Sequence, residues 1–150
     1  MRVWLAIVVL FLLVAGMPMA RAARVCTQDE AHHAEDDSVR LGLADRLSSW
    51  TEVYNSFNLY GHCDDGAIAE AYSDAIAIRL AEHWSSVNEL LRYTRVNRSF
   101  DDFVIRHVDT LMTPKQAKTI IMNARKKCPS GGGQLCRLII ASIRNETNQR

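Results

Sequence analysis

The fold is decided by the stretch AIAEAYSDAIAIRLAEHW at residues 67–84. Apolar side chains recur in it at three- and four-residue steps, which is typical of a helix with one buried face. This apolar stripe consists of Ile68, Tyr72, Ala75, Ile76, Leu80 and Trp84. Asp64 or Asp65 can cap the helix, because a carboxylate accepts the free backbone N–H groups at the positive helix end. We therefore predict that this stretch is the central helix of a bundle.

Upstream, a second apolar stripe begins at Val39 and continues to Phe57 at the same helical spacing. Its members are Val39, Leu43, Leu47, Trp50, Val53, Tyr54 and Phe57. We predict one helix over this segment, ending at Gly61. Residues 23–35 are polar and have no apolar period, so we interpret them as a flexible N-terminal arm that is ordered mainly if Cys26 is bridged.

Downstream, three further helices are indicated by their start signals, and a last helix follows them. The pattern from Ser86 to Glu89 fits a capping box, and Ser99 with Asp102 is a weaker version of it. Thr113-Pro114-Lys115-Gln116 is the clearest start, because proline suits the first helical position and Gln116 completes the box. That helix should reach about Lys127, and a last helix should cover residues 134–143.

The predicted fold is all-α, because no alternating apolar pattern indicates a strand. We expect a single-domain bundle of five or six helices over residues 36–146, with one or two disulfides and a frayed tail at 147–150. About 128 residues remain after an N-terminal segment is removed, which is enough for one hydrophobic core.

The first 22 residues are typical of a secretory signal peptide. Arg2 precedes the apolar run VWLAIVVLFLLV, Gly16 and Pro18 break the run, and Ala20-Arg21-Ala22 forms a small-x-small cleavage site. We predict cleavage between Ala22 and Ala23 and export to the periplasm, with full secretion as the alternative. An uncleaved anchor is the competing interpretation, since Val3–Met19 is near the lower limit for a spanning helix. We expect membrane contact only through the signal peptide.

The four cysteines follow the cleavage site, and an even count in a small exported chain predicts disulfides. Cys128 and Cys136 are favoured as one pair because proline and three glycines let the chain fold back between them. Cys26 and Cys63 would then pair by default. A metal site is the alternative, with His62 beside Cys63 and His32-His33 beside Asp29-Glu30. The usual zinc-ligand spacings are absent, so we predict no metal and no cofactor.

Charge is unevenly distributed along the chain. Residues 23–109 hold eight basic and sixteen acidic side chains, whereas residues 110–150 hold eight basic and one acidic. Either the two halves pack on each other, or the surface is bipolar and steers a charged partner. The basic half has no aromatic residue to stack on bases, so we predict no nucleic-acid partner.

No sequence motif indicates catalysis. His62, Cys63, Asp64 and Asp65 are consecutive, and neighbours in sequence seldom face one another as nucleophile and base. Three further candidates have simpler structural interpretations. Glu70 and Asp74 lie one helical turn apart and fit a solvated helix face, and His83 and His107 are each alone on a predicted helix. We therefore expect a binding protein and not an enzyme.

Residues 50–143 resemble small periplasmic proteins of Gram-negative bacteria, and most closely the immunity proteins of type VI secretion amidase effectors. The resemblance is carried by Trp50, the Cys63-Asp64-Asp65-Gly66 helix start, Trp84, the segment 103–109, and Cys128-Pro129 with Cys136. It implies a periplasmic antitoxin that inhibits a peptidoglycan-cleaving toxin and forms a homodimer, and it assigns no contact residue.

Two other functions fit the same sequence. A periplasmic stress chaperone would open at low pH and expose apolar surface. A small-molecule carrier would hold its ligand between helices, where Trp50, Tyr54, Tyr72 and Trp84 could line a pocket. Ordinary core packing is the simpler role for these four aromatic side chains.

Overall fold

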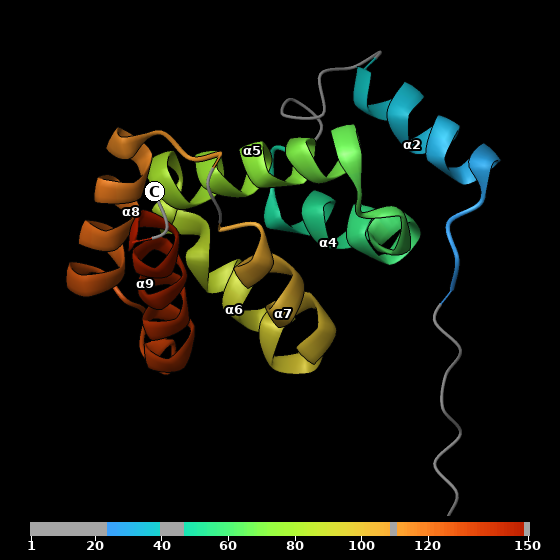
Figure 1. Cartoon of the computed structure of the whole chain (residues 1–150). Coiled ribbons are helices and arrows are strands. Elements are labelled where there is room, and N and C mark those ends of the chain that lie inside the picture. The colour runs from blue at the N-terminus through green and yellow to red at the C-terminus, as the bar shows by residue number, and fades with distance from the viewer. Residues whose placement is uncertain (1–23, 40–46, 109–110, 149–150) are drawn as a thin grey trace, which may run out of the picture.

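The structure is a computed structural model that describes residues 24–39, 47–108 and 111–148 (Figure 1). The described residues are all-α and include no strand, as predicted. They form seven α-helices and two short 3-10 turns, one helix more than expected. The elements are α2 (Gln28–Val39), α4 (Trp50–Tyr60), η1 (Gly61–Cys63), α5 (Gly66–Glu82), η2 (Trp84–Ser86), α6 (Val87–Val96), α7 (Arg98–Arg106), α8 (Pro114–Lys126) and α9 (Gly133–Asn148).

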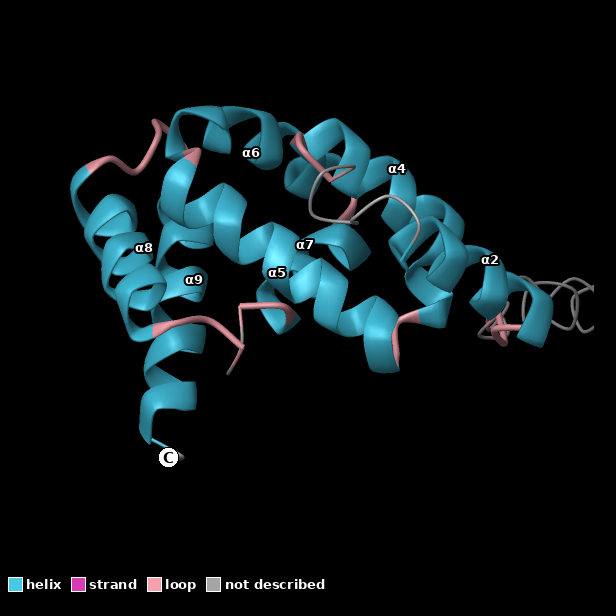
Figure 2. Cartoon of the chain, turned by 90° about the horizontal axis from the view of Figure 1, so that it is seen from above, coloured by secondary structure: helices cyan, strands magenta, loops and turns pink. Residues whose placement is uncertain are grey.

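Helix α5 is central, as its apolar stripe predicted. It packs against α2, α4 and α8, while α8 pairs with α9 and α6 pairs with α7. Figures 1 and 2 show α2 at one end of the molecule and the α8–α9 pair at the other, with α5 running between them. Asp65 caps α5 by accepting a hydrogen bond from the Gly66 backbone N–H.

The core is aromatic where α4, α5 and α7 meet. Phe57 and Phe103 have ring centroids 4.8 Å apart, and Tyr72 meets Phe103 edge-on at 4.9 Å. Trp50, Tyr72 and Phe103 are almost completely buried. Among the four aromatic residues considered for a carrier pocket, Trp50, Tyr72 and Trp84 are buried, and Tyr54 is half-buried and stacked on Tyr93.

Cys26 is bridged and residues 24–35 are ordered, as the conditional prediction for this arm stated, but the expectation that helix begins only at residue 36 was wrong, because α2 begins at Gln28. Its first turn is a capping box: the Thr27 hydroxyl accepts from the Glu30 backbone N–H at 3.2 Å, and the Glu30 carboxylate accepts from the Thr27 backbone N–H at 3.0 Å. The single helix predicted from Val39 to Phe57 was also wrong, because α2 ends at Val39, residues 47–49 are not helical, and Ser49 caps α4.

The downstream helix starts agree with their predictions to different degrees. Thr113 and Gln116 form the full capping box. Helix α6 begins after Ser86, but the Ser86 hydroxyl donates to the His83 carbonyl and caps no helical N–H. Asn97, not Ser99, caps α7. Helix α9 continues to Asn148, so the first residues of the predicted frayed tail are helical.

Both expected disulfides are present, with Cα atoms 4.9 Å apart for Cys26–Cys63 and 6.2 Å apart for Cys128–Cys136. The predicted signal peptide at 1–22 and the cleavage site at Ala22 and Ala23 lie outside the described residues. Within the described part of the chain, no helix combines the length and apolar character that crossing a bilayer requires.

Candidate functional site

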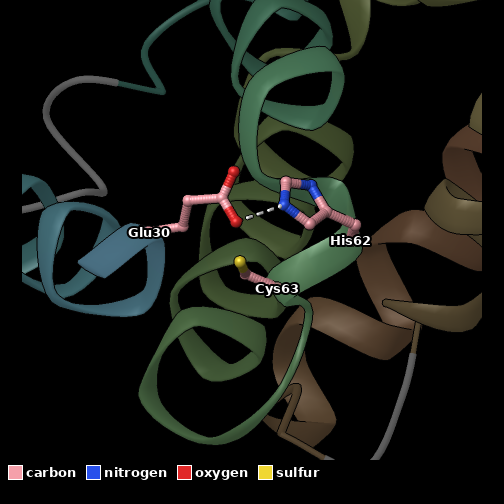
Figure 3. Close-up of side chains that lie close together, drawn as sticks. All are labelled: Glu30, His62 and Cys63. Carbon is pink, nitrogen blue, oxygen red and sulfur yellow. Dashed lines mark ion pairs between the residues drawn. The ribbon is translucent and has the colours of Figure 1, made fainter. Parts of the chain in front are cut away.

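Among the described residues, one group of side chains that could bind a metal ion lies at the Cys26–Cys63 bridge. Glu30 comes from the first turn of α2, whereas His62 and Cys63 come from the η1 turn that follows α4 (Figure 3). The Glu30 carboxylate lies 3.3 Å from His62 Nε2. The ligand atoms of Glu30, His62 and Cys63 all lie within 4.8 Å of one another. The fold therefore brings together Glu30 and His62, which are about thirty residues apart in the sequence.

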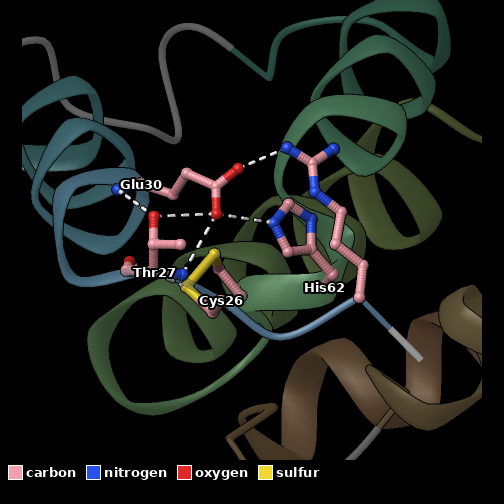
Figure 4. A network of polar contacts seen from close by, with 6 residues as sticks. Cys26, Thr27, Glu30 and His62 are labelled. Atoms are coloured by element: carbon pink, nitrogen blue, oxygen red, sulfur yellow. Dashed lines mark hydrogen bonds and ion pairs between the residues drawn. A yellow bond between two sulfur atoms is a disulfide. The ribbon is translucent and has the colours of Figure 1, made fainter. Parts of the chain in front are cut away.

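Glu30 is held in place by several donors at once (Figure 4). Its carboxylate accepts from the Thr27 backbone N–H at 3.0 Å and from the Thr27 hydroxyl at 2.9 Å, and it pairs with Arg24. The Thr27 backbone bond, followed by the bonds from His62 and the Thr27 hydroxyl, lowers the pKa of Glu30 to about 2. The carboxylate is consequently ionised and oriented toward His62.

A hollow of about 590 Å³ lies beside this cluster. Its lining includes Thr27, Ala31, His62, Asp64, Asp65 and Ile68, together with the bridged cysteines. The acidic side chains Asp64 and Asp65 thus share this hollow with the apolar side chains Ala31 and Ile68. Of the residues considered for a metal site from sequence, the structure brings Glu30 and His62 into one cluster and leaves His33 and Asp29 exposed outside it.

A second polar chain connects α5, α7 and the η1–α5 link. His107 Nδ1 lies 2.9 Å from the Ser73 hydroxyl, and His107 Nε2 lies 3.1 Å from the Asp64 carboxylate. Arg106 donates to the same carboxylate at 3.1 Å. Burial opposes ionisation of Asp64, but His107 and Arg106 outweigh it and hold its pKa below the usual range.

The order serine, histidine, aspartate resembles a hydrolytic triad, but its burial argues for a structural role. Ser73 is 2% exposed and His107 is 4% exposed. A nucleophile must reach a substrate carbonyl, and no such approach exists for a hydroxyl sealed in the core. The chain therefore joins three elements of the bundle. The contacts of His107 with Ser73 and Asp64 were not predicted from the sequence, where His107 was a lone histidine on its helix.

The second bridge closes a short loop between α8 and α9. Gly131 has a positive φ of 72°, and the Gly132 N–H donates to the Pro129 carbonyl at 2.9 Å. Arg95 at the end of α6 donates to the Gly131 carbonyl at 3.2 Å. The loop residues 129–132, called here the Cys128–Cys136 loop, are thus fixed both by the bridge and by contact with α6.

Two hollows of about 330 Å³ and 520 Å³ lie against this loop. Leu91 and Arg95 line both of them, Arg98 lines the smaller, and Arg92 lines the larger. Asp101 also lines the smaller hollow; its Oδ1 atom is buried and has no hydrogen-bond partner among the described residues. Burial raises the pKa of Asp101 above its usual range, and the nearby Arg98 opposes that rise.

The remaining candidates from sequence stay apart from these clusters. Glu70 and Asp74 are both exposed on α5, as expected for a solvated helix face. His83 is exposed, and its carbonyl accepts from the Ser86 backbone N–H at 2.9 Å. These residues add no further site.

The described fold and clusters define a small all-α bundle with two disulfides, a polar cluster at one bridge and two hollows with arginines in their lining at the other. No family model, curated protein or solved structure matches this chain.

Proposed function

We propose that this chain is an exported, non-catalytic binding protein, and specifically a periplasmic immunity protein that inhibits a peptidoglycan-cleaving toxin of the amidase type. The observation that carries the proposal is the Cys128–Cys136 loop, which is fixed at a surface hollowed on both sides. The resemblance of residues 50–143 to amidase immunity proteins supports the choice of partner.

A rigid loop suits an inhibitor because it enters a cleft without losing conformational freedom. The bridge restrains the chain at Cys128 and Cys136, and Arg95 ties Gly131 to α6 at 3.2 Å. A segment that is already ordered loses less entropy when its partner binds. The hollows beside the loop can accept side chains that project from the rim of the partner's cleft.

Charge indicates which partner surface would fit. The side chains of Arg92 and Arg95 are exposed where they line the hollows. Arg98 is exposed as well, and its guanidinium forms an ion pair with Asp102 at 3.6 Å. A guanidinium has five N–H donors, so Arg95 can keep its bond to Gly131 and still bind a carboxylate. We expect an acidic rim on the partner, because opposite charge across an interface speeds association and fixes orientation.

Two disulfides support a site of action outside the cytoplasm. Disulfides such as Cys26–Cys63 and Cys128–Cys136 persist in secreted and periplasmic proteins, whereas the reducing environment of the cytoplasm disfavours them. A protein that meets a cell-wall hydrolase would work in that oxidising compartment. Homodimerisation is part of the same proposal and is open to measurement by light scattering.

The test is affinity capture from periplasmic extract with the oxidised protein, read by mass spectrometry and followed by inhibition of the captured hydrolase. Recovery of one stoichiometric cell-wall hydrolase is the expected result. Many unrelated proteins would favour the stress chaperone, and co-purified ligand in native mass spectrometry would favour the carrier. Failure to bind or inhibit any cognate cell-wall hydrolase at micromolar concentration would overturn the proposal.

A pair of arginine variants tests the binding surface itself. Arg95→Glu reverses the charge of a residue that lines both hollows, whereas Arg125→Glu changes an exposed arginine on α8 that lines neither. We expect the first variant to weaken partner binding about tenfold or more and the second to leave it unchanged. Equal affinities for both variants would place the interface elsewhere on the surface.

A further inference from the structure

The two bridges differ in what surrounds them. Glu30 and His62 lie beside the Cys26–Cys63 bridge (Figure 4), with the carboxylate 3.3 Å from the imidazole Nε2. Among the described residues, no second group of three histidine, cysteine or acidic side chains lies this close together. The Cys128–Cys136 bridge is therefore a natural control within the same molecule.

We propose that the Cys26–Cys63 cluster is a redox-gated metal site, in which reduction of the bridge frees two thiolates that bind one Zn²⁺ together with His62 and Glu30. A dithiol reductant would open the site by exchange: its two sulfurs join in a new disulfide, and Cys26 and Cys63 become thiols. Zinc then displaces one proton from each thiol, and His62 Nε2, which donates to Glu30 in the oxidised protein, gives up its proton so that its lone pair can bind the metal. This role is independent of partner inhibition, and it begins only when the bridge is broken.

The atom spacing fits the preferred geometry of zinc. Zinc bonds of about 2.0–2.3 Å in a tetrahedron place neighbouring ligand atoms about 3.4–3.8 Å apart. The Glu30 oxygen and His62 nitrogen are already 3.3 Å apart, and Cys63 Sγ lies within 4.8 Å of both. Cys26 Sγ is bonded to Cys63 Sγ in the oxidised protein, and it would supply the fourth ligand after reduction.

The surroundings hold the non-sulfur ligands in place. The Thr27 backbone N–H and hydroxyl both bind the Glu30 carboxylate, which is the kind of outer support that orients metal ligands. Cys63 is buried, and the His62 side chain is only 14% exposed. The ligands come from both α2 and η1, so the metal would keep these elements joined after the covalent bond is lost.

Consequently, either the disulfide or the bound metal would attach α2 to the rest of the bundle. A structural zinc site contributes its binding free energy to folding. Reduced protein with zinc should therefore hold α2 more tightly than reduced protein without metal does, and its unfolding midpoint in urea should be higher.

The experiment uses Co²⁺ as a visible zinc probe on the purified protein, after anaerobic reduction with a phosphine and removal of the reductant. We expect one Co²⁺ per chain with thiolate-to-cobalt charge-transfer absorption and intense tetrahedral d–d bands, both abolished by added Zn²⁺. The oxidised protein should show neither. Absence of the charge-transfer band in reduced protein would overturn the proposal, whether or not the metal-free chain keeps its helical circular dichroism.

Matched variants assign the ligands. His62→Gln and Glu30→Gln keep all four cysteines, so the bridge can form during folding, and each should weaken Co²⁺ binding at least about tenfold. His33→Gln removes an exposed histidine of α2 that lies outside the cluster and should change nothing. A Cys128→Ala, Cys136→Ala double variant should retain the band. Loss of the band in that variant, or unchanged affinity in both His62→Gln and Glu30→Gln, would refute the assigned site.

Discussion

Removal of each bridge in turn should destabilise the protein to a different extent. The perturbations are the double variants Cys26→Ala, Cys63→Ala and Cys128→Ala, Cys136→Ala. The first bridge joins residues 37 apart in sequence, whereas the second joins residues 8 apart. A bridge restricts the unfolded chain more when it closes a longer loop, so the first should contribute more to stability.

The loop lengths give the magnitudes. The chain-entropy relation predicts a loss of about 3.8 kcal/mol of unfolding free energy without Cys26–Cys63, and about 2.5 kcal/mol without Cys128–Cys136. The larger figure requires α2 to stay docked. Without the bridge its described attachments include buried Ala34 and the contact between Glu30 and His62.

Urea unfolding followed by far-ultraviolet circular dichroism measures both losses. We expect a lower midpoint for each variant, with the larger decrease in the Cys26→Ala, Cys63→Ala protein and an unchanged dependence on urea. A shallower dependence would report that α2 had already undocked, since that slope scales with the surface exposed on unfolding. A loss for Cys128–Cys136 equal to or larger than that for Cys26–Cys63, at unchanged slope, would refute the loop-entropy reasoning.

Four single substitutions test other parts of the structure. Gly131→Ala should lower the unfolding free energy by about 1–2 kcal/mol in urea titrations, because φ is 72° and an added Cβ would collide with the Arg95 guanidinium. Thr113→Ala should cost about 1 kcal/mol in thermal unfolding, and Ser86→Ala less, since only Thr113 caps a helical N–H. Burial raises the pKa of Asp101, so the folded state holds that proton more tightly; the resulting stability is present at acid pH and is lost as pH rises through the folded pKa. Asp101→Asn should therefore exceed wild type in urea midpoint at pH 7, and the gap should close toward acid pH.

Local signals explain which parts of the fold could be predicted. The stripe of α5 and the Thr113–Gln116 box each depend on residues within a few turns of one helix. The Cys128–Cys136 pair needed only a short, glycine-rich segment between its members. The residue spacing within each of these segments was therefore enough to predict its structure.

Helix α2 shows why periodicity can fail. Its sequence QDEAHHAEDDSV has no regular apolar stripe, so nothing in it indicates a buried face. Its start was nevertheless readable, because Thr27 and Glu30 have capping-box spacing and form both of its hydrogen bonds. The long helix predicted from Val39 to Phe57 failed for the opposite reason: its apolar spacing continues through residues 47–49, which are not helical and lead into the Ser49 cap.

Prediction of the candidate site required knowledge of a contact between residues that are far apart in the sequence. Glu30 follows Cys26 by four residues and His62 precedes Cys63 by one, so their contact follows once those cysteines are paired and α2 is helical. The interpretation of residues 23–35 as a flexible arm removed the second condition. The chain Ser73–His107–Asp64 had no such guide, because no covalent link or motif connects α5 with α7.

The two bridges have separable consequences because they lie in different settings. Reduction frees the Cys128–Cys136 loop, and no cluster of metal ligands among the described residues stands ready to replace that covalent bond. At the other end of the bundle, Glu30 and His62 can combine with the freed thiolates and hold α2. Zinc added to reduced protein should therefore strengthen the attachment of α2 without restoring the rigid loop on which the proposed partner inhibition depends. Restoration of inhibition by zinc would mean that α2, and not the loop, carries the inhibitory surface.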